Sequence, residues 1–363
     1  GRNTKIGVRL VRPDSKCHHV VKGVIYSNQH RQKMSCNNQR TPPSSIVTIA
    51  NANRVLRASI PINKSGKQTT ELVGRSWAGD CTSFVVPSLG LALDAGYVVH
   101  SKRMDSVFIT HCHTDHCHNM THLKSLTKPP NVYLPSEGVD RMENFINVSQ
   151  QLTSNLTPEE YGDIQWGVTH VLHGVHAGDR IIVNKKRGLV CHVVQCDHRV
   201  PCVGFCFSQT RQQLREEYKG LPGPEIGKLR KQGISVTEEE EHPLLCFLGD
   251  TTVSILDGPD ADRIFSCPTV IIECTFLNED CRENAERTKH VLWHDLRPHV
   301  LSHPGTTFIL IHFSHRWSVQ DVSDFFQKEG LHNVIPWIPS NDIGLFCQPA
   351  GEGVAVDEVW SHF

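Results

Sequence analysis

No stretch of the sequence is long and apolar enough to cross a membrane, because a spanning helix needs about eighteen or more consecutive apolar residues. The nearest stretch, residues 84–100, is interrupted by a proline, two glycines and an aspartate. An excess of charge of one sign is also lacking, since 37 Lys and Arg face 38 Asp and Glu for a formal net charge of −1. No overall field therefore attracts nucleic acid, and any such binding must depend on local patches.

The fourteen cysteines include no Cys-x-x-Cys pair, which argues against a compact metal knuckle or a redox motif. They are scattered along the chain, and Cys206, Cys246 and Cys274 fall inside apolar runs. This pattern predicts reduced, mostly buried thiols in an intracellular protein rather than a disulfide scaffold.

Acidic residues are nearly missing from the first 57 positions, where Asp14 stands against eleven Lys and Arg. We predict a basic N-terminal extension over residues 1–57 and one folded catalytic domain over residues 58–363. A basic, acid-poor leader is typical of an organelle transit peptide, of an arm that contacts RNA phosphates, or of a plain solvated extension. The protein is expected inside the cell, in the cytoplasm or nucleus, or in mitochondria if the leader is a targeting signal.

The densest cluster of chemically active side chains lies in residues 106–118, where a short apolar strand runs into His-Cys-His-Thr-Asp-His. His111 and His113 are two positions apart and project to the same side of an extended chain, so they can hold one cation. Asp115 and His116 follow the turn and can reach a second cation a few ångströms away. Imidazole nitrogen and carboxylate oxygen suit zinc, and three protein ligands with one open position mark a catalytic site.

Three later apolar strands also end in a metal-binding side chain, namely His198, Asp250 and His312. We predict His198 as the third ligand of the first ion, Asp250 as the bridge between the two ions, and His312 as the last ligand of the second. Four other histidines lie in mid-strand or in polar loops and are expected to be structural: His170, His173, His176 and His192.

Two acidic residues belong to apolar strands without being predicted ligands. Asp94 either orients a metal-bound histidine from behind or is a turn residue at the end of its strand. Glu273 lies within the apolar run 269–276 and is expected to be buried. A buried carboxylate is costly unless it is paired, and His290 is the candidate partner.

Apolar strands that each end in His or Asp, with helices between them, predict a fold of the α/β class. Two sheets would pack face to face with helices outside, as a four-layer αββα sandwich whose ligands meet at one edge. A helix is expected after His118, and residues 318–328 show the pattern of an amphipathic helix. Residues 138–152 predict another helix with five side chains at core spacing: Val139, Met142, Phe145, Ile146 and Val148.

Residues 209–232 carry six Lys and Arg around the turn Leu221-Pro-Gly-Pro224. Such a run is either the solvated face of a helix or a loop that grips an anionic substrate. The acidic run Glu238–Glu241 is expected to be solvated surface.

In these motifs the sequence resembles the metallo-β-lactamase superfamily and, within it, tRNase Z, the tRNA 3′-processing endonuclease, in its short, plant-type form. The His-x-His-x-Asp-His motif at 111–116 marks the superfamily. The segment Glu217–Leu229, the Glu-Cys-Thr-Phe run at 273–276 and the His-Phe-Ser-His-Arg run at 312–316 narrow it to the processing nucleases. The resemblance covers about residues 72–317.

The resemblance implies a metallo-β-lactamase fold with two Zn²⁺ per chain, precursor tRNA as substrate, and a homodimer. Asp115 would also orient the attacking hydroxide, and Glu273 with His290 would form the pair that protonates the leaving oxygen. It assigns seven ligands: His111, His113 and His198 on one zinc, Asp115, His116 and His312 on the other, and Asp250 between them. The sequence departs from the family in having no Gly-rich flexible arm between His118 and His198, and in Ile272, where many members have a histidine.

Three alternatives share much of this pattern. A glyoxalase II-like thioesterase would have nearly the same ligands, but a thiolate leaves without a proton donor, and its third histidine usually sits in a Gly-His-Thr turn. A small-molecule phosphodiesterase could use the same metal site. A catalytically silent RNA-binding subunit is contradicted by the complete ligand set. We therefore expect a zinc-dependent endoribonuclease that removes the 3′ trailer from precursor tRNA by phosphodiester hydrolysis, leaving a 3′-hydroxyl on the tRNA and a 5′-phosphate on the trailer.

Overall fold

The computed structural model describes residues 55–99, 104–154, 157, 168–339 and 348–349. Most of the expected basic extension, residues 1–57, therefore lies outside the described residues. Its last two positions, Leu56 and Arg57, already pair with the neighbouring strand, so the folded part begins slightly before the expected boundary at residue 58.

The strands form two mixed sheets. The eight-stranded sheet has the order β15 (Gln348–Pro349), β1 (Leu56–Pro61), β2 (Thr69–Trp77), β3 (Cys81–Val86), β4 (Leu91–Leu93), β5 (Ser106–Phe108), β6 (Asn131–Pro135) and β7 (Val171–Val175). The seven-stranded sheet has the order β14 (Val334–Pro336), β13 (Thr307–Ile311), β12 (Thr269–Glu273), β11 (Thr237–Phe247), β10 (Val203–Leu214), β9 (Leu189–Gln195) and β8 (Arg180–Asn184).

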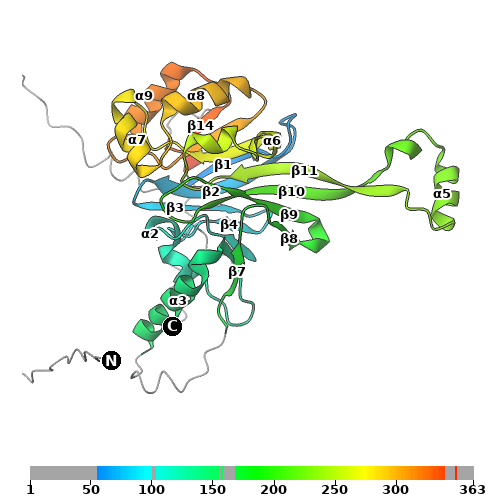
Figure 1. Ribbon diagram of the computed structural model, residues 1–363, viewed down its shortest axis with the longest axis horizontal. Coiled ribbons are helices and arrows are strands. Elements are labelled where there is room, and N and C mark those ends of the chain that lie inside the picture. The colour runs from blue at the N-terminus through cyan, green and yellow to red at the C-terminus, as the bar shows by residue number, and fades with distance from the viewer. Residues whose placement is uncertain (1–54, 100–103, 155–156, 158–167, 340–347, 350–363) are drawn as a thin grey trace, which may run out of the picture. The chain divides into compact units, whose positions relative to one another are not determined.

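The α-helices other than α5 cover the outer faces of the two sheets (Figure 1). The α-helices are α2 (Thr114–Cys117), α3 (Val139–Thr153), α5 (Gly223–Lys231), α6 (Ala261–Ser266), α7 (Arg282–Thr288), α8 (Trp293–Ser302) and α9 (Val319–Glu329). The short 3₁₀ turns are η1 (His118–His122), η2 (Ser136–Gly138), η3 (Lys185–Arg187), η4 (Glu216–Tyr218), η5 (Val253–Asp257) and η6 (Glu279–Cys281). Among the described helices, none is long and apolar enough to cross a membrane.

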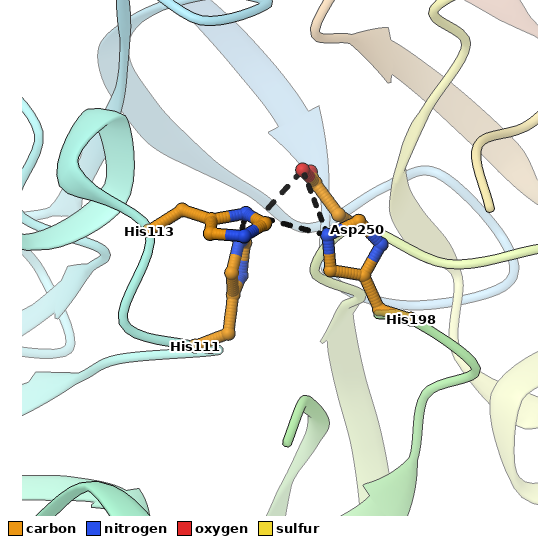
Figure 2. A group of neighbouring side chains, drawn as sticks. All are labelled: His111, His113, His198 and Asp250. Atoms are coloured by element: carbon orange, nitrogen blue, oxygen red, sulfur yellow. Dashed lines mark hydrogen bonds and ion pairs between the residues drawn. The ribbon is translucent and has the colours of Figure 1, made fainter. Parts of the chain in front are cut away.

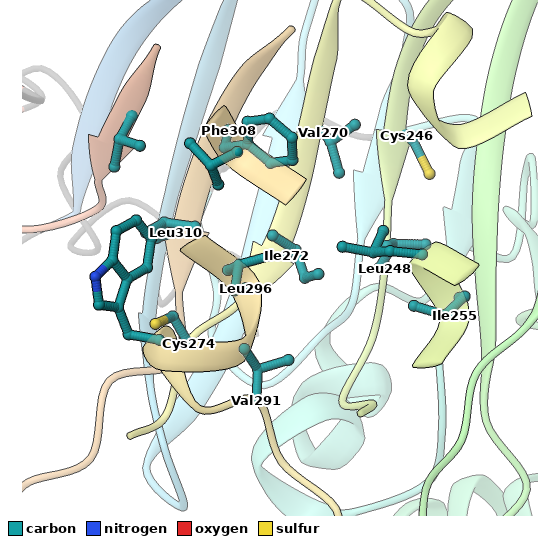
Figure 3. Packing of buried hydrophobic residues seen from close by; sticks show 14 of the residues in the cluster. Cys246, Leu248, Ile255, Val270, Ile272, Cys274, Val291, Leu296, Phe308 and Leu310 are labelled. Carbon is teal, nitrogen blue, oxygen red and sulfur yellow. The ribbon is translucent and has the colours of Figure 1, made fainter. Parts of the chain in front are cut away.

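Alternating side chains on the central strands build three apolar layers, which explains the four-layer arrangement. On β13, Phe308 and Leu310 pack toward α8 and α9, whereas Ile309 and Ile311 pack between the two sheets. Figure 3 shows the first of these layers, with Leu296 of α8 packed near strands β12 and β13. Because side chains alternate along a strand, a strand buried on both faces must be apolar throughout, as these are. The predicted αββα sandwich is confirmed.

Helix α3 covers the other sheet with a narrower face than the sequence suggested. Met142 and Ile146 are buried, and Val139 packs against them, as expected. Phe145 and Val148, however, are 40% and 52% exposed, so their assignment to the core was wrong. The helix buries only the stripe at i and i+4, and these two residues lie outside it. The helix expected after His118 is the single 3₁₀ turn η1.

The carboxyl ends of the parallel strands meet at one edge. Strands β4, β5 and β6 run parallel in one sheet, and β11, β12 and β13 run parallel in the other. The residues that follow these strands are therefore brought to the same rim of the sandwich, as expected from the strand-ending motifs.

Strands β10 and β11 extend beyond their neighbours as a hairpin that carries α5 near its tip (Figure 1). The acidic run Glu238–Glu241 belongs to β11 and is not simply solvated surface. Arg180 donates to Glu241 at 2.8 Å and to Glu239 at 3.1 Å, and His192 contacts Glu241 at 2.8 Å. These contacts join the base of the hairpin to β8 and β9. The sequence has no Gly-rich arm between His118 and His198, and the projecting hairpin follows His198 in the chain.

Candidate metal centre and proton donor

The first group of converging side chains combines both sheets (Figure 2). His111 and His113 follow β5, His198 follows β9, and Asp250 follows β11. One nitrogen or oxygen of each lies within 4.8 Å of the others. His113 Nδ1 is 3.0 Å from His111 Nε2 and 3.3 Å from His198 Nε2. Three ring nitrogens and a carboxylate oxygen around one point are a donor set that suits zinc.

The second group contains Asp115 and His116 of α2 together with His312, which follows β13. Asp115 Oδ2 is 3.5 Å from His312 Nε2 and 3.7 Å from His116 Nε2. Asp250 also reaches this group, with oxygens 3.5 Å from the Nε2 atoms of both His116 and His312. The structure thus brings together all seven side chains that the sequence analysis selected, with Asp250 between the two groups.

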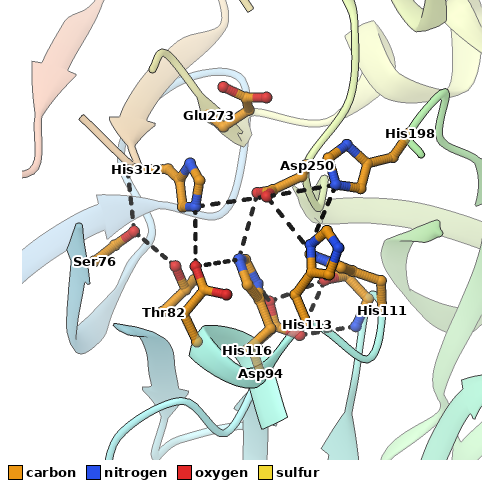
Figure 4. Close-up of polar contacts among 12 residues, drawn as sticks. Ser76, Thr82, Asp94, His111, His113, His116, His198, Asp250, Glu273 and His312 are labelled. Atoms are coloured by element: carbon orange, nitrogen blue, oxygen red, sulfur yellow. Dashed lines mark hydrogen bonds and ion pairs between the residues drawn. The ribbon is translucent and has the colours of Figure 1, made fainter. Parts of the chain in front are cut away.

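The outer ring nitrogens are anchored, which aims the inner nitrogens at the centre; Figure 4 shows the contact of His116 with Asp94. His116 Nδ1 lies 2.8 Å from Asp94 Oδ2, and His198 Nδ1 lies 3.1 Å from the Lys289 carbonyl. His312 Nδ1 lies 2.9 Å from the hydroxyl of Thr275. Because an acceptor at Nδ1 keeps the proton there, Nε2 retains the lone pair that a metal requires.

Asp94 is completely buried, and it supports His116 directly and His111 through Thr110. It contacts His116 directly, and it accepts hydrogen bonds from the backbone and hydroxyl of Thr110. The Thr110 hydroxyl in turn lies 3.1 Å from His111 Nδ1. Of the two interpretations of Asp94, the structure therefore favours support of the histidines over a simple turn.

Two buried atoms in the second group lack a hydrogen-bond partner, namely Nε2 of His116 and Nε2 of His312. A buried polar atom without a partner is destabilising, and such atoms often mark the place of an ion. Three carboxylates, those of Asp94, Asp115 and Asp250, also lie close to His116. A cation would satisfy the orphaned nitrogens and balance this negative charge, so the residues fit a metal.

The pKa values support the same arrangement. Burial lowers the pKa of His111, His113 and His198, so these rings are neutral and able to bind a metal. Burial also lowers the pKa of His116, but the charges of Asp250 and Asp94 prevail and raise it to about 9. When no cation is bound, a second proton on the His116 ring therefore balances the charge of these carboxylates, and a bound metal ion would displace it. The pKa of Asp250 is held well below its usual value because the surrounding histidines outweigh its burial.

A carboxylate–imidazole pair lies beside both groups. Glu273 is completely buried, and its Oε1 is 2.7 Å from His290 Nδ1. The other oxygen of Glu273 accepts hydrogen bonds from the backbone and hydroxyl of Thr275. The His290 ring lies 5.1 Å from that of His198 and 5.2 Å from that of His312, measured between centroids. Burial lowers the pKa of His290, but Glu273 and Asp250 raise it to about 9. The ring therefore carries a proton at neutral pH.

One glycine allows α2 to approach the strand ends. A Cβ atom on Gly96 would lie 1.7 Å from the carbonyl oxygen of Asp115, so no larger residue fits there. The backbone N–H of Gly79 donates to Asp115 Oδ2 at 2.9 Å and fixes that carboxylate. Both contacts place Asp115 at the rim.

The four histidines that were expected to be structural lie outside these groups. His170 contacts the carbonyl of Met120, His173 contacts Asn131, His176 contacts Ser136, and His192 contacts Glu241. The sequence analysis missed Thr110 and Thr275, which link acidic residues to ring nitrogens. The one signal for them in the sequence is that each lies two positions after the last residue of a buried strand.

The αββα sandwich with a double His/Asp group at its edge is typical of metal-dependent hydrolases with the metallo-β-lactamase fold. No protein-family model matches the chain. Two Arabidopsis thaliana proteins are similar to it. tRNase Z TRZ1 is 28% identical over 259 residues, which cover 69% of this chain and 88% of the relative. Chloroplastic tRNase Z TRZ2 is 24% identical over 282 residues, which cover 75% and 76%.

A ribonuclease Z of Methanococcus maripaludis is 26% identical over 245 residues, which cover 60% of this chain and 74% of the relative. The short form of human tRNase Z, a solved structure, covers 66% of this chain and 91% of its own length, with 16% identity and a TM-score of 0.43. The fold protein YhfI from Bacillus subtilis covers 77% and 95%, with 13% identity and a TM-score of 0.43. The sequence matches confirm the resemblance to tRNase Z that the motifs predicted.

Proposed function

We propose that this protein is a zinc-dependent endoribonuclease that removes the 3′ trailer from precursor tRNA. One observation carries the proposal: the pair formed by His290 and the buried Glu273 lies against two metal-ligand groups, in a chain whose relatives are named tRNase Z. Hydrolysis of an unactivated phosphodiester needs both a charge-stabilising centre and a proton donor for the leaving oxygen.

We assign two zinc ions to the site. His111, His113 and His198 would hold one, Asp115, His116 and His312 would hold the other, and Asp250 would contact both. This assignment is supported by the convergence of the ring nitrogens and by the orphaned Nε2 atoms of the second group. A pair of zinc ions held there would supply Lewis-acid stabilisation of the attacking and leaving oxygens.

The side chains around this centre have separate roles in the proposed reaction. Asp115, fixed through one oxygen by the Gly79 amide, accepts a hydrogen bond from the attacking water and orients it. His290 has its Nδ1 engaged by Glu273, so its Nε2 donates a proton to the departing 3′-oxygen of the ribose. The products are a tRNA with a 3′-hydroxyl and a trailer with a 5′-phosphate.

The projecting hairpin is the proposed grip on tRNA. Lys228, Arg230 and Lys231 lie in the last turn of α5 and are exposed. They form a positively charged group at a distance from the rim. Such residues pair with backbone phosphates and contribute affinity that depends strongly on salt. The contacts of Arg180 with Glu239 and Glu241 hold the base of the hairpin to the body and so set its direction.

Incubation of the full chain with a 3′-extended precursor tRNA tests the proposal. Cleavage after the discriminator region, mapped to one nucleotide, should be abolished by a chelator and restored by added zinc. End analysis should find a 3′-hydroxyl on the tRNA. A thioester and a cyclic nucleotide serve as parallel substrates. Turnover of either one, with intact precursor tRNA, would contradict the nuclease proposal.

A homodimer is the assembly that we propose. Phe145, Val148 and Leu152 form an exposed apolar stripe on the outer face of α3, with exposed fractions of 40%, 52% and 84%. Such a stripe is typical of a protein–protein contact. Light scattering should show a dimer that Phe145→Ser with Val148→Ser converts to monomer. The control is Leu301→Ser, at an exposed apolar residue of α8, and a dimer that survives in the double variant would place the interface elsewhere.

We propose that the enzyme acts inside the cell, in the cytoplasm, nucleus or mitochondria, because precursor tRNA is its proposed substrate. Imaging of the full chain, with and without residues 1–54, tests which compartment holds it. If the chain is imaged in an organelle and the chain without these residues is not, they are a targeting segment.

A further inference from the structure

Three non-glycine residues of the described chain have a positive φ angle: Asp94 at 55°, Lys289 at 55° and His312 at 63°. This backbone conformation is unfavourable for a residue with a Cβ atom and persists where the surrounding structure gains by it. Asp94 holds His116, and His312 belongs to the second ligand group. The third, Lys289, is neither a predicted ligand nor a predicted proton donor, yet it lies at the same rim.

The left-handed conformation of Lys289 results from the way α7 ends. Its N–H donates to the carbonyl of Glu286, and the N–H of His290 donates to the carbonyl of Ala285 at 3.0 Å. This pair of bonds is the helix ending that usually places glycine at the left-handed position. Here a lysine occupies it, with φ 55° and ψ 56°. A helix stop alone would not require a side chain at this position.

The turn directs two groups toward the site at once. The carbonyl of Lys289 lies 3.1 Å from Nδ1 of His198 and accepts its proton. The next residue, His290, is thereby placed with its Nδ1 2.7 Å from Glu273. One peptide unit therefore fixes both a proposed metal ligand and the proposed proton donor.

The side chain of Lys289 adds a second connection to the same residues. Its Nζ donates to Asp197 Oδ1 at 2.6 Å, and Asp197 directly precedes His198. The Asp197 N–H donates to the hydroxyl of Thr251 at 3.0 Å, and the Thr251 N–H donates to Glu273 Oε1 at 3.3 Å. The network thus closes from Lys289 through Asp197 and Thr251 to Glu273 and His290.

We propose that Lys289 is a positioning residue that sets His198 and His290 together, its left-handed carbonyl orienting the ligand and its ammonium group holding Asp197. This inference rests on the proposed function for the roles of the two histidines. The positions of the metal ligand His198 and of the proton donor His290 are therefore coupled, so a change at Lys289 alters both.

Zinc affinity, measured by competition with a chromophoric chelator, tests the backbone part. Lys289→Val opposes the left-handed conformation and should weaken zinc binding about 10- to 100-fold, the usual effect of losing a partner that orients a ligand. Lys289→Gly keeps the conformation without strain but lacks the ammonium group, so it should bind zinc about as tightly as Lys289→Met and more tightly than Lys289→Val. Equal zinc affinity in the valine variant and the parent would refute the carbonyl's role. This measurement needs no RNA, so it stands even if the nuclease proposal fails.

The side-chain part is tested with Lys289→Met and Asp197→Asn. Each should weaken zinc binding, and the double variant should be no weaker than the stronger single effect, because both changes break one ion pair. Additive losses would show that the two residues act independently and would overturn this part.

A matched control separates positioning from helix ending. Gly330 also ends a helix, α9, with φ 63°, and its Cβ position is open space. Gly330→Val should lower the melting temperature and leave zinc affinity unchanged. If Lys289→Val behaves in the same way, and its relative turnover of activated and unactivated phosphodiesters matches the parent, Lys289 is only a helix stop.

Discussion

Replacing His290 with alanine is expected to separate two kinds of substrate. The His290 ring is held at 2.7 Å by Glu273 and lies between His198 and His312, so it can protonate a departing oxygen at the centre. The ribose 3′-oxygen of precursor tRNA is a poor leaving group and needs that proton. An aryl phosphodiester such as a p-nitrophenyl ester has a leaving group that departs as a stable anion.

General acid catalysis is typically worth about 10²–10⁴-fold in rate, or about 3–5 kcal/mol of transition-state stabilisation. The His290→Ala variant should therefore lose about that factor in kcat on precursor tRNA. On the aryl ester the loss should be at least about tenfold smaller, because little proton transfer is needed there. Single-turnover assays on both substrates measure the ratio directly and exclude product release.

The metal content of the variant must be measured in the same preparation, since His290 adjoins Asp250 at 3.9 Å. His294→Ala is the matched control, because His294 is exposed and contacts Glu279 rather than the site. Equal losses on the two substrates, with metal content intact, would refute the assignment of His290 as proton donor.

Four further outcomes are expected. Because Glu273 and Asp250 raise the pKa of His290 to about 9, turnover of precursor tRNA should fall as the pH rises through the pKa of this residue. In a pH–rate profile, Glu273→Gln should move this alkaline decline to lower pH. An unmoved decline would show that Glu273 does not set the pKa of the proton donor. Exchange of Lys228, Arg230 and Lys231 for glutamine should reduce the slope of log affinity for tRNA against log salt concentration by about one per lost phosphate contact. The same exchange at the control residues Lys185, Lys186 and Arg187 should leave the slope unchanged. Equal slopes for both variants would show that α5 does not contact tRNA. Asp94→Asn should weaken zinc binding about 10- to 100-fold in chelator competition, and parent-like affinity would show that Asp94 does not support the ligands. Ser318→Ala removes the cap of α9 and should cost about 1 kcal/mol in chemical denaturation, with no change in zinc affinity; unchanged stability would show that the capping box is dispensable.

The strand-ending motifs could be located from the sequence because their positions follow from simple geometry. Val107 and Ile309 lie in short apolar runs, and the side chains that follow such parallel strands must meet at one edge. The pairing of Glu273 with His290 was also predictable, because a carboxylate in an apolar strand requires a partner. Burial and charge compensation thus constrain distant residues as firmly as local pattern does.

The features that the sequence did not predict depend on tertiary contacts. Phe145 and Val148 are apolar and lie near a helical core pattern, but which stripe of α3 is buried depends on the sheet beneath it. The projecting hairpin was hidden because its strands are polar, and β11 is held by pairing with β10 and by Arg180. The left-handed backbone of Lys289 has no sequence signal, since glycine is the residue normally expected there.

Each ligand group draws on both sheets, and this has a thermodynamic consequence. His111 and His116 belong to the eight-stranded half, whereas His198 and His312 belong to the seven-stranded half. An ion bound by both halves would hold them together. Saturation with zinc should therefore raise the free energy of unfolding by the free energy of zinc binding. Starvation for metal would then loosen the sandwich itself and leave an enzyme that is both silent and easier to degrade.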